Sequence, residues 1–159
     1  MRLVRRLLSI FAILALAFVL APPAFAGGLT AADQAAVTRY NLTEDFLERA
    51  LALARDAATQ PTAQPQLDLS GVTSLDDMAA KLEAEPSVHD LLVKHGFTAK
   101  DYLVGTAALG QSMLAARLEA DPAQAGTLDR SKFNDANVAF YRTHQDKVAL
   151  LMAMLSAGQ

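Results

Sequence analysis

The longest regular pattern of the chain runs from Thr98 to Glu119 and predicts one long helix. Thr98 can cap its first turn, with Asp101 three residues on, as in a capping box. No charged residue occurs between Tyr102 and Ala116. Apolar or small residues occupy nearly every side, which predicts a buried helix with neighbours on several faces. One stripe contains only small residues, and we expect a helix to pack closely on it, with a ligand groove as the alternative: Gly105, Ala108, Ser112 and Ala115.

Four other segments have the apolar spacing of amphipathic helices. The first runs from Thr30 toward Ala58 and can bend or restart at 41–43. Two short helices follow, capped by Ser74 and by Ser87, and Pro61 and Pro65 make 59–70 a linker. The last helix begins at Ser131 or Asn134 and runs to about Leu155. The pattern therefore predicts an all-α protein, a single compact bundle of about five helices with a long buried central helix.

The last predicted helix has an apolar face in which polar residues take several places. This seam has the 4-3-4-3-4 spacing of a bundle contact and consists of Asn137, Tyr141, His144, Val148, Leu151 and Leu155. Asn137, Tyr141 and His144 are the candidate ligand-binding residues, because amide, phenol and imidazole groups on one face can hold a small polar ligand. The alternative that we favour is that these three are core polar groups that fix the helix register.

The first 26 residues carry the features of a cleaved secretory signal peptide. Three arginines precede a short apolar run, and two prolines and the small-x-small pattern of Ala24 to Ala26 follow it. A membrane anchor is the alternative, which the shortness of the run disfavours. Cleavage after Ala26 leaves residues 27–159 as the mature helical domain and removes three positive charges, so the net charge changes from −3 to −6.

This acidic mature chain is expected in the periplasm, or outside the cell as the alternative. Binding to nucleic acid needs clustered Lys and Arg, which the sequence lacks. We also expect no membrane association once the signal peptide is removed. Because the chain has no Cys, disulfides, thiol catalysis and iron–sulfur clusters are excluded.

We expect no cofactor, no metal site and no catalytic residue. His89 and His95 are six residues apart, which is not the spacing of a helical metal pair. Met152 and Met154 could bind Cu(I), but two methionines near a chain end more often fill space.

Several residues of the C-terminal half are similar to those of a known group of proteins. They are His95-Gly96, Thr98, Tyr102, Asn134 to Val138 and Phe140 to His144. With these residues the chain resembles an uncharacterised family of small exported all-helical proteins from proteobacteria. The resemblance implies a helical fold and export, and no particular activity.

Three hypotheses for function follow. The first is an exported, non-catalytic interaction or accessory protein with an unknown protein partner. The second is a small-ligand-binding bundle that uses Asn137, Tyr141 and His144, and the third is an enzyme that uses His144. A dry, closed seam favours the first hypothesis, whereas a pocket that reaches His144 favours the other two.

Overall fold

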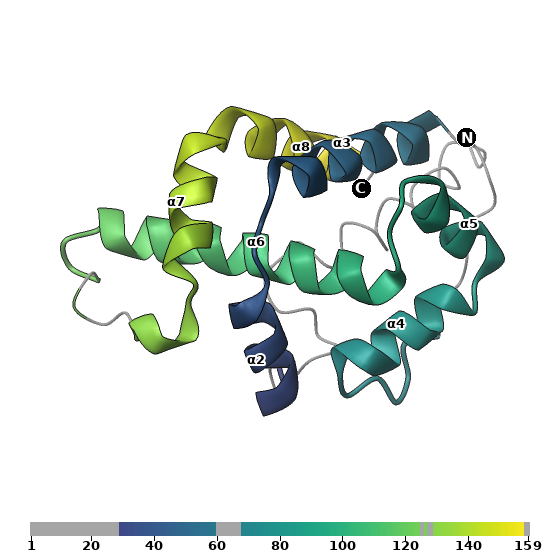
Figure 1. Ribbon diagram of the computed structural model, residues 1–159, viewed down its shortest axis with the longest axis horizontal. Helices are drawn as coiled ribbons and strands as arrows, with labels where there is room; N and C mark the ends of the chain where they lie inside the picture. Colours follow the sequence, from purple (N-terminus) through teal and green to yellow (C-terminus); the bar gives the residue numbers. More distant parts are fainter. Residues whose placement is uncertain (1–28, 60–67, 125, 127–128, 158–159) are drawn as a thin grey trace, which may run out of the picture.

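The described part of the chain folds into helices, as predicted. The computed structural model describes residues 29–59, 68–124, 126 and 129–157, so the predicted signal peptide and most of the linker lie outside the described residues. Within that part there is no strand. The helices, shown in Figure 1, are α2 (Ala31–Arg39), α3 (Glu44–Thr59), α4 (Leu75–Glu83), α5 (Pro86–Lys94), α6 (Ala99–Ala120), the 3-10 helix η4 (Arg130–Lys132), α7 (Asp135–Thr143) and α8 (Gln145–Ala157).

Helix α6 is the element around which the others are arranged, and it contacts α2, α4, α5 and α7. It begins where the sequence predicts, because the Thr98 hydroxyl accepts a hydrogen bond from the Asp101 N–H at 3.0 Å. Just before it, Gly96 has a φ of +73°, and the Phe97 N–H donates to the Leu92 carbonyl at 2.9 Å. This is the Schellman ending that a Gly followed by an apolar residue favours.

The described residues contain seven α-helices, whereas the sequence analysis predicts about five. The first predicted helix is two helices, because residues 40–43 leave helical geometry between α2 and α3. Tyr40 has an extended backbone with ψ of 134°, and Thr43 accepts a hydrogen bond from the Phe46 N–H at 3.1 Å to restart the chain as α3. The alternative of a restart at 41–43 is therefore confirmed.

The prediction of one continuous C-terminal helix was wrong, because His144 separates α7 from α8. In Figure 1, α7 crosses the C-terminal half of α6, and α8 then lies alongside α3. Lys147, near the start of α8, pairs with Glu44 at 2.5 Å and with Glu48 at 3.2 Å, both near the start of α3. One straight helix could not both cross α6 and lie alongside α3. The break at His144 changes the direction of the chain so that both contacts form.

The start of the second short helix also differs from the prediction, since α5 begins at Pro86 with Glu85 as its N-cap, two residues before the predicted cap Ser87. Proline suits the first position of a helix, where its missing N–H would have no partner within the helix. None of the helices in the described ranges is both long enough and apolar enough to cross a membrane.

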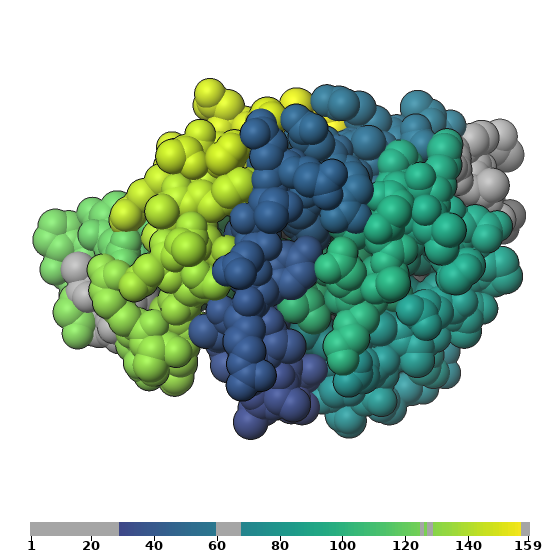
Figure 2. All heavy atoms as spheres, viewed as in Figure 1, coloured from purple at the N-terminus to yellow at the C-terminus, as the bar shows by residue number. Residues whose placement is uncertain are grey.

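Helix α6 is not buried on every side along its whole length. Its small stripe is buried, and the Phe46 ring lies against Gly105, so the prediction of close packing is confirmed at that position. Further along, however, Leu114 is 44% exposed, and Leu118 is only partly buried. Figure 2 shows the middle of α6 covered by other segments on this face, while its C-terminal end projects at one side. The core therefore lies around the first two thirds of α6.

Candidate functional site

Asn137, the first of the candidate ligand-binding residues, faces inward and is only 2% exposed. Its amide nitrogen donates to the Tyr40 carbonyl at 2.8 Å, and its amide oxygen accepts from the Leu42 N–H at 2.8 Å. The side-chain amide thus forms hydrogen bonds with backbone groups of the non-helical connection between α2 and α3. Both ends of the amide are used within the fold, which is the role of a satisfied core polar group.

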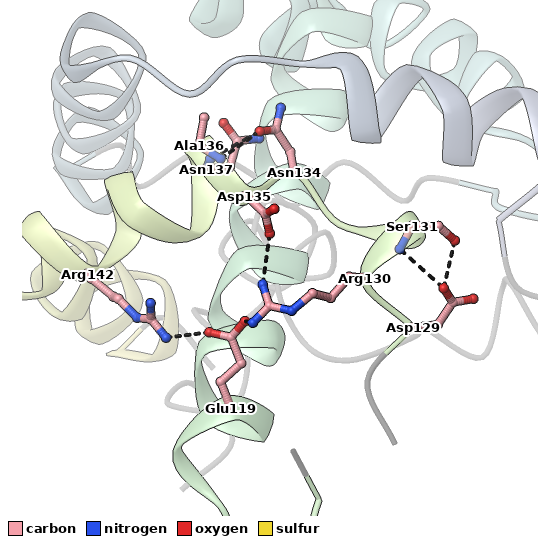
Figure 3. A network of polar contacts seen from close by, with 9 residues as sticks. All are labelled: Glu119, Asp129, Arg130, Ser131, Asn134, Asp135, Ala136, Asn137 and Arg142. Atoms are coloured by element: carbon pink, nitrogen blue, oxygen red, sulfur yellow. Dashed lines mark hydrogen bonds and ion pairs between the residues drawn. The ribbon is translucent and has the colours of Figure 1, made fainter. Parts of the chain in front are cut away.

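Asn134, three residues before Asn137, holds the same connection. Its side-chain oxygen caps α7 by accepting from the Ala136 and Asn137 N–H groups, as Figure 3 shows. Its amide nitrogen donates to the Thr38 and Tyr40 carbonyls, each at 3.1 Å. From the sequence, Asn134 was predicted only as a helix cap. Two Asn residues one turn apart could have indicated a pair of side-chain amides that bind backbone groups, but the carbonyls that they bind lie more than ninety residues away in the sequence.

Tyr141 and His144 are half-buried. The Tyr141 ring packs against both apolar clusters of the core. The His144 ring stacks on Phe140, with 4.1 Å between ring centroids, and its Nδ1 lies 2.8 Å from the Phe140 carbonyl oxygen. Nδ1 also lies 2.9 Å from the Thr143 Oγ1, and the His144 N–H donates to the same Phe140 carbonyl at 3.1 Å, so the His144 ring lies against the end of its own helix.

The three seam residues therefore serve different parts of the fold. Asn137 binds the connection between α2 and α3, Tyr141 fills space in the core, and His144 binds the end of α7. No hydrogen bond joins any two of these three side chains in the described structure. The sequence placed them on one helical face, but the break at His144 ends that face.

A cluster of ion pairs that was not predicted lies at the C-terminal end of α6. The Glu119 carboxylate of α6 forms ion pairs with Arg130, at 2.6 Å, and with Arg142 of α7 (Figure 3). Only 12% of the Glu119 side chain is exposed. Arg130 extends the cluster to Asp135 at 3.1 Å. Two guanidinium groups satisfy one carboxylate, so Glu119 ties α7 and η4 to α6. Helical spacing carries no signal for this contact, because Arg130 and Arg142 lie outside α6.

A second polar cluster joins the ends of α3 and α5. One Asp56 carboxylate oxygen lies 2.7 Å from Lys94 Nζ and 2.9 Å from His95 Nε2. The hydrogen bond from Lys94, followed by that from His95, holds the pKa of Asp56 below its usual value. His95 lies at the end of α5, where its Nε2 is within hydrogen-bond distance of the Asp56 carboxylate.

Tyr40 is another titratable residue that serves the fold. The Tyr40 hydroxyl donates to Asp101 at 3.1 Å, and burial, followed by the Asp101 charge, raises the pKa of Tyr40 well above its usual value. Among the described residues, no group of three or more His, Asp or Glu side chains could hold a metal ion. Every buried side-chain N or O atom in the described ranges has a hydrogen-bond partner.

No family model matches the sequence, and neither the curated proteins nor the solved structures contain a significant match.

Proposed function

We propose that this chain is an exported, non-catalytic interaction or accessory protein that acts in the periplasm. The observation that carries the proposal is the position of exposed apolar side chains on uncharged stretches of helix. Leu150 of α8 is 43% exposed and Leu114 of α6 is 44% exposed, and each lies in a run of at least ten residues without a charge. Contiguous apolar surface marks protein–protein contacts, and the exposed residues Ala149 and Ala153 extend the apolar surface around Leu150.

The small-ligand hypothesis has weaker support. Asn137, the most deeply placed of its three residues, uses its amide on the backbone of Tyr40 and Leu42. The enzyme hypothesis meets a similar difficulty, since His144 Nδ1 binds the carbonyl of its own helix. A general acid or base needs a free nitrogen aimed at substrate, and the other nitrogen of His144 would have to supply it.

Export is supported by the arginines, the apolar run and the Ala24 to Ala26 pattern of the N-terminal 26 residues. The full chain, expressed with a C-terminal tag, should be recovered from the periplasmic fraction with Gly27 as its first residue. N-terminal sequencing of the purified protein checks this. A protein that keeps Met1 and stays in the membrane fraction would mean that the segment is an anchor.

The interaction itself is tested by photo-crosslinking in the periplasm. A photoreactive amino acid in place of Leu150 should give a discrete crosslinked protein band. The same amino acid in place of Glu83, which is exposed on the charged surface of α4, serves as the control. Crosslinks at neither position, together with a small molecule that co-purifies with the wild type and is lost on Tyr141→Ala, would favour the ligand hypothesis instead.

A further inference from the structure

Helices α7 and α8 are joined through a single residue. Helix α7 ends at Thr143 and α8 begins at Gln145, and His144 between them has a φ of −118° and a ψ of 23°. A residue inside an α-helix has a φ of about −63° and a ψ of about −42°. From Asp135 to Ala157 the chain contains no Pro and no Gly, which are common causes of a helix kink. The composition of this stretch therefore also suits one straight helix.

The bend at His144 forgoes backbone hydrogen bonds. The N–H groups of residues 145–147 donate to no backbone carbonyl in the described structure. In a straight helix they would donate to the carbonyls of residues 141–143, four positions before them. At the bend, the Thr143 hydroxyl donates to the Phe140 carbonyl at 2.9 Å, and His144 Nδ1 lies 2.8 Å from the same oxygen. Two side chains thus support a geometry in which three backbone donors have no backbone acceptor.

Helix α8 is held in place mainly by its contact with α3. Three of its apolar side chains are at most 2% exposed and pack toward the core that α3 lines: Val148, Leu151 and Leu155. At the start of α8, Lys147 pairs with Glu44 and Glu48 of α3. Helix α7 packs instead on α6. The two helices are therefore attached to different parts of the fold, and His144 is the connection between them.

We propose that two copies of this chain exchange their α8 helices. In the exchanged dimer, α7 and α8 of each copy form one straight helix, and each α8 lies on the α3 of the other copy. The fold itself defines the partner, because the α3 surface that α8 covers in the monomer is the surface that each copy offers to the other. Exchange of an identical element is a low-cost route to a dimer. The inference goes beyond the proposed function and does not rest on it, since it uses only contacts made within the fold.

The arrangement of the helices is compatible with this exchange. In Figure 1, α7 runs toward the edge of the molecule, and α8 turns there to lie alongside α3. A straight continuation of α7 therefore leads away from the molecule, where a second copy can receive it. A connection of one residue is also the kind of short hinge that favours exchange between copies.

The balance between monomer and exchanged dimer depends on protein concentration. Each copy of the dimer buries the same apolar side chains of α8 and forms the same Lys147 ion pairs as the monomer. Each straight hinge adds the backbone hydrogen bonds that the bend lacks, and it loses the side-chain contacts to the Phe140 carbonyl. Against the dimer stands the freedom that two copies lose when they associate. The monomer is therefore favoured in dilute solution and the dimer in concentrated solution.

Refolding at two concentrations tests the exchange. The mature chain, purified after expression of the full gene, is unfolded in urea and refolded at about 1 μM and at about 1 mM. Sedimentation velocity should show a dimer only after refolding at the higher concentration. This dimer should persist for a time after dilution, because α8 must leave the partner copy before it can return to its own α3.

Two substitutions at the hinge test whether the connection straightens. His144→Ala and His144→Gly both remove the ring that lies on the Phe140 carbonyl, so they differ mainly in helix propensity. Ala favours a helix interior over Gly by about fivefold for each of the two hinges of the dimer. His144→Ala should therefore form clearly more dimer than His144→Gly at the same concentration.

Reversal of the ion pairs tests which copy α8 contacts. One variant carries Lys147→Glu, and the other carries Glu44→Lys together with Glu48→Lys. Each variant alone sets like charges against each other, whereas an exchanged heterodimer restores opposite charges at both contacts. Native mass spectrometry of the two variants refolded together should show more heterodimer than random pairing gives.

A matched control uses an ion pair that the exchange leaves within one copy. Lys100 of α6 pairs with Asp76 of α4 at 2.6 Å, so Lys100→Glu refolded with Asp76→Lys should pair at random. Wild type and His144→Ala that both stay monomeric at about 1 mM would overturn the proposal. Equal dimer in the two His144 variants, or random pairing of the Lys147→Glu mixture, would overturn it as well. Crosslinking through position 150 would still report on the proposed interaction function in each of these cases.

Discussion

Phe46 of α3 lies against the backbone of Gly105 in α6, so closely that a Cβ atom on Gly105 would lie 2.6 Å from Cζ of the ring. The ring has little freedom to withdraw, because it is 1% exposed and stands edge-on to Tyr40 at 5.7 Å and to Phe97 at 5.5 Å between centroids. Gly105 is thus the residue that allows α3 to approach α6.

Gly105→Ala should lower the free energy of unfolding by about 1–3 kcal/mol, the usual cost of an overpacked core. This loss should exceed the roughly 1 kcal/mol that replacing Gly by Ala gains inside a helix. Urea unfolding followed by circular dichroism measures the difference. Gly110→Ala on the same helix is the control, because a Cβ there meets nothing within 4 Å. It should stabilise the protein by roughly 0.5–1 kcal/mol, and an equal gain in stability at Gly105 would show that Phe46 moves away freely.

Asn137→Ala should leave the buried Leu42 N–H without its side-chain partner, and it should remove one of the two amides that donate to the Tyr40 carbonyl, the other being Asn134. A buried polar group without a partner costs about 1–3 kcal/mol, so we expect a loss of at least that size in urea melts. Asn137→Asp keeps the shape but sets a carboxylate oxygen against the Tyr40 carbonyl, so it should also destabilise. Asn41→Ala, at an exposed position on the same connection, should change stability little. A neutral Asn137→Ala would contradict the structural role and reopen its use in ligand binding.

Glu119→Gln should weaken the attachment of α7 and η4 to α6, because it removes the negative charge that Arg130 and Arg142 share. Since the Glu119 side chain is only 12% exposed, we expect a loss of about 1–3 kcal/mol. Hydrogen exchange should show the change first in the amides of α7. Asp135→Asn removes an exposed partner of Arg130 and should have a much smaller effect. Similar losses in the two variants would mean that Glu119 contributes no more than a surface ion pair.

The Asp56 cluster should make part of the stability depend on pH. In the folded protein the hydrogen bond from Lys94, and to a smaller extent that from His95, lowers the pKa of Asp56. The Asp56 carboxylate therefore binds a proton more readily in the unfolded chain. The contribution of Asp56 is therefore fully present above the usual Asp pKa of about 3.9, and it is lost as pH falls through the lower folded value. Thermal melts of wild type and Asp56→Asn should differ at pH 6 and converge as the pH drops below about 4. Asp90→Asn, on the exposed side of α5, should follow wild type throughout, and a constant gap between wild type and Asp56→Asn would contradict this account.

The local features of the fold could be predicted from the sequence because each depends on neighbouring residues. Thr30 and Thr98 cap their helices through residues three positions on, and Gly96 ends α5 with a left-handed residue. The uncharged run from Tyr102 also correctly indicated the helix around which the others pack. These signals span at most a few turns, and hydrogen bonds of that range form in any tertiary context.

The helix break at His144, the roles of the candidate site residues and the Glu119 cluster were decided only by the tertiary structure. Asn137 reaches Leu42 across 95 positions, and Glu119 reaches Arg142 across 23, so helical periodicity has no information on either contact. The seam from Asn137 to Leu155 is regular in sequence, but α7 packs across α6 and α8 packs alongside α3. The helix therefore breaks at His144, and the seam is interrupted there. The sequence alone therefore determined where most of the helices start and which faces are apolar. How the helices pack decided which of those faces are buried. It also decided which polar groups form hydrogen bonds or ion pairs within the fold.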